Sequence, residues 1–105
     1  MELGRNKINS RKGYFLKGPI DWEWISAAAK LPGKALHVAI AISMCEAINK
    51  KTMFRLSRKW LNDLGVGRSA TYRALHQLER LEIIKVERSK GRLPIINVIR
   101  QIPIK

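Results

Sequence analysis

The stretch that decides the fold runs from Ser57 to Glu82 and reads SRKWLNDLGVGRSATYRALHQLERLE. Its first residues predict a short helix that begins after Ser57, whose hydroxyl can accept hydrogen bonds from free backbone N–H groups. Gly65 can adopt the left-handed conformation in which helices commonly end. Residues 68–81 repeat apolar side chains at spacings of three and four, which is typical of a helix with one buried face. The stretch therefore predicts two helices joined by a tight turn, with Val66 packed between them.

A β-hairpin pattern follows the second helix directly. Residues 84–88 alternate apolar and polar side chains, as in a strand with one buried face. The next four residues, 89–92, include a glycine and have the composition of a turn, and residues 93–100 return as a second strand. Pro94 lacks a backbone N–H, so we expect it at a sheet edge or near the start of its strand.

Two further helices are predicted upstream. Asp21 can cap a helix over residues 22–30, which ends before Pro32. Residues 33–49 are apolar on more than one face, which is typical of a helix at the centre of a core, and residues 53–56 fit a short strand. Residues 1–13 are polar and basic without a period, so they predict a flexible arm. Residues 14–105 then form a single domain, mainly α with a small antiparallel β-sheet.

Charge separates the two halves of the chain. The 105 residues include 21 Lys and Arg against 8 Asp and Glu, a formal net charge of +13. Residues 50–105 hold 14 basic and 4 acidic residues, whereas residues 1–49 hold 7 and 4. Such an excess favours a polyanionic partner and says nothing about the fold. DNA, RNA and an anionic membrane surface all satisfy it at this level.

Composition excludes several classes of protein. Cys45 is the only cysteine, so no internal disulfide forms. The most apolar run, residues 35–45, is too short to span a membrane, and no secretory signal pattern precedes it, so we expect a cytoplasmic protein. There is no glycine-rich phosphate loop or paired-carboxylate motif, and the two histidines have no cysteine partners for zinc. We therefore expect neither an enzyme nor a metal or other cofactor.

The outward side chains of the second helix suit contact with nucleic acid. Arg can address guanine O6 and N7 together, Ser and Gln accept or donate, and Lys mainly contacts phosphate. The hairpin tip adds three cations around its glycine, and the shorter helix begins with two more. The candidate contacts are Arg58, Lys59, Arg68, Ser69, Tyr72, Arg73, His76, Gln77, Arg88, Lys90 and Arg92.

Each candidate also has a plain structural interpretation. A basic helix face can be an ordinary solvated face, and His76 an ordinary surface histidine. Tyr72 can be half-buried packing, and the three tryptophans are better explained as core or interface residues than as stacking platforms. The arm of residues 1–13 carries four cations and resembles arms that reach DNA, and the alternative is that it is simply disordered.

The order strand, helix, turn, helix, hairpin resembles the winged helix-turn-helix superfamily of bacterial DNA-binding domains. The resemblance covers about residues 33–99, and its best motifs are LGVGRS (64–69), YRAL (72–75), Leu78-Glu79 and Ile83-Ile84. It implies a three-helix core with a β-hairpin wing, the helix-turn-helix over about 57–82 and the wing over about 83–100. The lead-in of residues 14–34 resembles small winged-helix proteins of bacterial mobile elements. Two departures are Gly67, where a Ser or Thr cap is common, and Glu82, where a Gly is common.

The resemblance implies sequence-specific binding of double-stranded DNA, in transcriptional control and often as a homodimer. Helix 68–81 would lie in the major groove and residues 88–92 on flanking backbone, with the helix near Asp21–Lys30 as the dimer contact. A role in replication, plasmid maintenance or transfer of a mobile element would use the same surface. The alternative is a winged-helix module that binds protein, with weak or non-specific nucleic-acid binding.

Overall fold

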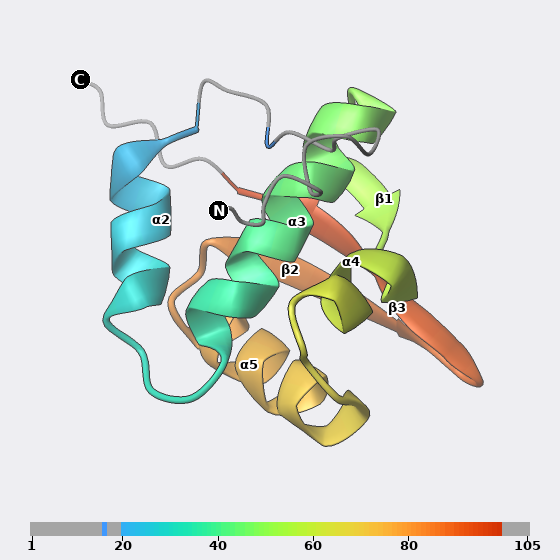
Figure 1. Cartoon of the computed structure of the whole chain (residues 1–105). Helices are drawn as coiled ribbons and strands as arrows, with labels where there is room; N and C mark the ends of the chain where they lie inside the picture. The colour runs from blue at the N-terminus through green and yellow to red at the C-terminus, as the bar shows by residue number, and fades with distance from the viewer. Residues whose placement is uncertain (1–15, 17–19, 100–105) are drawn as a thin grey trace, which may run out of the picture.

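The computed structural model describes Leu16 and residues 20–99, which fold into helices around one small sheet (Figure 1). The elements, in chain order, are α2 (Trp22–Ala29), α3 (Ala35–Asn49), β1 (Met53–Arg55), α4 (Arg58–Asp63), α5 (Arg68–Arg80), β2 (Ile84–Ser89) and β3 (Arg92–Val98). The arm predicted for residues 1–13 lies outside the described residues, as does the predicted end of the hairpin at residue 100.

Helix α3 is the centre of the core, as its apolar composition predicts. It packs against α2, α4, α5 and β1, and its buried residues include Val38, Ala41 and Ile42, each fully excluded from solvent. Alanines on α3 and α5 (Ala39 and Ala74 among them) allow the helices to approach closely. Burial of this apolar surface supplies the main driving force for folding, roughly 25 cal/mol for each Å² removed from water.

Helix α2 packs against α3, with Ala28 and Trp24 buried in the core. The indole Nε1 of Trp24 donates a hydrogen bond of 3.0 Å to the carbonyl oxygen of Ile83. This bond joins α2 to the segment between α5 and β2. Trp22, two residues earlier, is 75% exposed, so the tryptophans of α2 divide between core and surface.

The three strands form an antiparallel sheet in the order β1-β3-β2. Of the two places expected for Pro94, a sheet edge or the start of its strand, the structure confirms the second, since β3 is the central strand of the sheet. Pro94 is near the start of β3, where the pairing with β2 shifts register between Glu87 and Ser89. A proline is tolerated at such an irregularity because no ladder hydrogen bond is lost there. Its carbonyl accepts a 3.0 Å hydrogen bond from Leu56 N.

The mixed fold of helices with a small antiparallel sheet confirms the predicted fold class at this coarser level. The expectation that Leu81 follows the inward stripe of its helix is wrong, because its side chain is 40% exposed. Helix α5 ends at Arg80, and the backbone of Glu82 is left-handed with φ +62°. The chain therefore leaves the helix before Leu81 can face the core.

Candidate nucleic-acid interface

The turn between α4 and α5 has the local structure that the sequence predicts. Ser57 caps α4, since its Oγ accepts a hydrogen bond of 3.3 Å from Lys59 N. Gly65 is left-handed with φ +73°, and Val66 is buried between the two helices, with its N–H bonded to Leu61 O at 2.9 Å. These contacts fix the direction in which α5 leaves the turn.

Helix α5 has one buried face and one exposed strip. The buried residues are Thr71, Ala74, Leu75 and Leu78. The buried hydroxyl of Thr71 has a hydrogen-bond partner, because Oγ1 donates to Gly67 O at 2.8 Å. The helix has no side-chain cap, as expected for Gly67. The exposed strip of α5 consists of Ser69, Arg73, His76 and Arg80. None of these four side chains is acidic, and three of the four belong to the predicted contact set.

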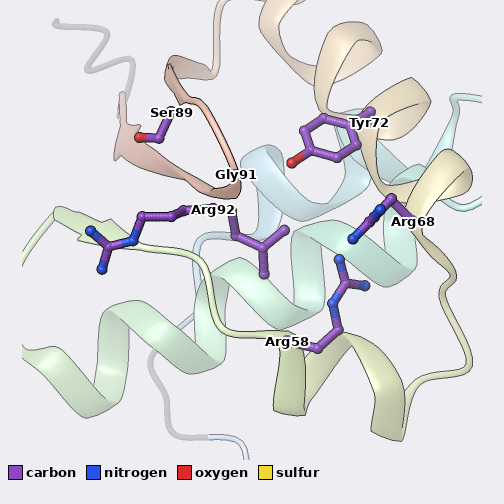
Figure 2. Close-up of a pocket in the computed structure, with 7 residues that line it drawn as sticks. Arg58, Arg68, Tyr72, Ser89, Gly91 and Arg92 are labelled. Atoms are coloured by element: carbon purple, nitrogen blue, oxygen red, sulfur yellow. The ribbon is translucent and has the colours of Figure 1, made fainter.

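A groove runs along the edge of α5 that faces the hairpin. It has a volume of about 410 Å³ and lies between the start of α4, the start of α5 and the hairpin turn (Figure 2). Its lining residues are Arg58, Arg68, Tyr72, Ser89, Gly91, Arg92 and Leu93. Four predicted contacts, spread over 35 positions of the sequence, thus meet in one place.

Arg73 and Gln77 lie on the opposite edge of α5. With Ala70 and Ala74 they line a second groove of about 260 Å³ against residues 32–34, which join α2 to α3. The predicted contact set is therefore divided by α5 into two flanks, with Ser69 and His76 on the exposed strip between them. Lys34, in this second groove, was not among the predicted contacts.

Two predicted cations already have carboxylate partners. Arg88 Nη1 lies 3.4 Å from Glu79 Oε1, which joins β2 to α5. Lys59 Nζ lies 3.8 Å from Asp63 Oδ2 and 5.0 Å from the centre of the Trp60 ring. Both ion pairs are about half exposed or more on the cationic side, so each is weak and open to exchange with another anion.

Arg55 of β1 binds the two strands of the hairpin next to its turn, and it was not among the predicted contacts. Arg55 Nη1 donates to Leu93 O at 2.6 Å and to Ser89 Oγ at 3.2 Å. The turn itself consists of Lys90 and Gly91, the latter left-handed with φ +74°, and Lys90 is exposed. No local signal marks Arg55, since its acceptors lie more than thirty residues away in the sequence.

Other kinds of site do not emerge from the same described residues. There, no three His, Cys, Asp or Glu side chains gather closely enough to hold a metal ion. The helices among residues 20–99 are too short or too polar to cross a membrane. Comparison with protein-family models, with curated proteins and with solved structures gave no match.

Proposed function

We propose that the chain is a winged helix-turn-helix domain that binds double-stranded DNA, with α5 as its recognition helix. The observation that carries this proposal is the exposed strip of α5, free of acidic side chains and adjacent to a groove lined by three arginines. Solvated helix faces usually mix charges of both signs. Here the one acidic side chain of α5, Glu79, is turned toward Arg88 of the hairpin.

In this proposal the exposed strip of α5 and the hairpin tip have different tasks. Ser69, Arg73 and His76 face outward together and would meet base edges in the major groove, where Arg reads guanine. Lys90 and Arg92 at the hairpin tip would lie against flanking phosphates, which position the protein without reading sequence. Control of transcription from a preferred site follows as the proposed role.

Selection of bound sequences from random duplex DNA tests the proposal most directly. Arg73→Ala should weaken binding to the selected site by roughly 1–3 kcal/mol and relax the preference at one base pair. Lys51→Ala is the matched control, since it removes one exposed cation from the loop between α3 and β1, outside the predicted contact set. If Arg73→Ala and Lys51→Ala lose the same affinity, Arg73 contributes only general attraction by charge. If the selection yields no preferred sequence, specific recognition is refuted.

One observation favours a second candidate, in which the chain binds protein through α2. The ring of Trp22 is 75% exposed, and an aromatic side chain of this size is typical of an interface anchor. The simplest such partner is a second copy of the chain. Sedimentation of the wild type and Trp22→Ala decides this: a dimer that the variant loses supports pairing through α2, and a monomer in both cases excludes it.

A further inference from the structure

The groove between α4, α5 and the hairpin has a composition that an ordinary surface hollow lacks. Three of its lining residues are arginines, two carry hydroxyl groups, and none of the described lining residues is acidic. They come from α4, α5, both strands of the hairpin and its turn, so the groove exists only in the folded chain. Its volume of about 410 Å³ lies in the lower part of the range of small-molecule sites, about 300–1,000 Å³.

Two of the arginines that line the groove face each other. In Figure 2 the side chains of Arg58 and Arg68 extend toward one another, whereas that of Arg92 runs outward along the rim. Within the described residues, neither Arg58 nor Arg68 has a carboxylate within ion-pair distance, unlike Lys59 and Arg88. Like charges held together destabilise the fold, and an anion placed between them removes that cost.

The remaining lining groups select the kind of anion. A guanidinium group offers a planar fork of N–H donors that matches two oxygens of a phosphate. The hydroxyl of Tyr72 points from α5 toward the hairpin side (Figure 2), where it can donate to a further oxygen. Ser89 Oγ accepts from Arg55, which leaves its own proton free to donate. Leu93 adds an apolar surface, which suits the carbon atoms of a sugar.

We propose that this groove is a binding site for a phosphate ester, with Arg58 and Arg68 holding the phosphate and Tyr72 and Leu93 contacting the attached sugar. The phosphate could belong to a DNA backbone or to a free nucleotide, because both present the same group. The first source rests on the proposed DNA-binding function. The second source, a free nucleotide, does not rest on that function. A soluble nucleotide bound in the groove would compete with DNA for the surface beside the hairpin.

The test is a titration of the whole chain with inorganic phosphate and, separately, with adenosine monophosphate. Backbone amide NMR spectra are recorded at each step of both titrations. Sodium chloride at equal ionic strength is the reference. Saturable shifts confined to residues 58, 68, 72 and 89–93 are expected with both phosphates and not with chloride. The variant Arg58→Gln/Arg68→Gln should lose saturation, whereas Lys51→Gln/Lys85→Gln, which removes two exposed cations outside the groove, should retain it.

A duplex DNA arm then separates the two sources. If the groove holds a backbone phosphate, Arg58→Gln/Arg68→Gln should lower duplex affinity several-fold more than the control. It should also reduce the salt slope by about one for each phosphate that the variant no longer neutralises. If the variant binds duplex like the control, or if no duplex binds the wild type, saturation by the monophosphate still supports a site for free nucleotide.

Phosphate shifts no larger or more localised than those of chloride overturn the proposal, whatever the variants do to duplex binding. The wild-type titration decides this without any variant.

Discussion

The end of α5 is strained in a way that a single substitution can relieve. The last turn closes with Glu82 N bonded to Glu79 O at 2.9 Å and Ile83 N bonded to Leu78 O at 3.4 Å. This pair of bonds is the Schellman arrangement, in which the residue after the cap is left-handed and is usually glycine. Here that residue is Glu82, with φ +62°. Glu82→Gly should therefore stabilise the fold.

Three contributions set the magnitude. A left-handed conformation costs a residue with a Cβ about 1–2 kcal/mol, and glycine avoids this. Glycine in turn loses more backbone freedom on folding, which destabilises the variant by about 0.5–1 kcal/mol and offsets part of that gain. Removal of an exposed carboxylate from the negative end of the helix dipole adds at least about 0.3 kcal/mol. The sum is a gain of about 1 kcal/mol in the free energy of unfolding, or roughly 4–8 °C in Tm for a domain of this size.

Thermal and urea unfolding followed by circular dichroism measure this gain, and two further variants separate its causes. Glu82→Ala removes the charge but keeps the Cβ, so it should recover only the small electrostatic part. Gly65→Ala is the reverse experiment, because Gly65 is left-handed at φ +73° and an added Cβ would meet nothing within 4 Å. It should cost about 1 kcal/mol from the backbone alone. If Glu82→Gly is no more stable than Glu82→Ala, the backbone at Glu82 is not strained and the reasoning fails.

Three other predictions concern the core. Trp24→Phe should lower the free energy of unfolding by about 1 kcal/mol in urea, the worth of the hydrogen bond to Ile83 O; no change would mean that α2 is held by burial alone. Leu75→Ala, at a fully buried position, should cost about 2–5 kcal/mol with an unchanged m-value, and a loss under about 1 kcal/mol would show that the core collapses around it. Burial raises the pKa of the Cys45 thiol above its ordinary 9.0, so the folded chain keeps a proton that the unfolded chain loses. Stability should then fall as pH rises above about 9, a slope that Cys45→Ala should reduce; an equal slope in both proteins would contradict the assignment.

The features that could be predicted from the sequence depend on short-range chemistry. Asp21 Oδ1 accepts from Glu23 N at 3.0 Å and from Trp24 N at 3.2 Å, as its capping pattern indicates. The left-handed Gly65 and the buried Val66 follow in the same way from their place between two amphipathic segments. In each case the residue and its partners lie within a few positions of one another, so the pattern contains the whole interaction.

The features that could not be predicted depend on pairing between distant segments. Nothing in residues 53–56 indicates that β1 would add to the hairpin and place β3, with Pro94, in the middle of the sheet. The apolar period of α5 continues through Leu81, and only the backbone at Glu82 shows that the chain has already left the helix. Arg55 follows the same rule, because its acceptors at Ser89 and Leu93 become neighbours only after the sheet has formed.

The candidate site was predicted as the outward face of one helix together with the hairpin tip and the start of the shorter helix, and the structure adds a groove between these three parts. Arg55 binds the hairpin turn, and the exposed Glu79–Arg88 pair adds a weak link to α5. The hairpin thereby lies beside the start of α5 and forms one wall of the groove that contains Arg58 and Arg68. Arg88 therefore has a structural reason to be basic that is independent of any ligand. The unpaired arginines of the groove have no such reason, since no contact within the described residues requires their charge. Charge that the fold does not use points to a ligand, and in the groove two such arginines lie together.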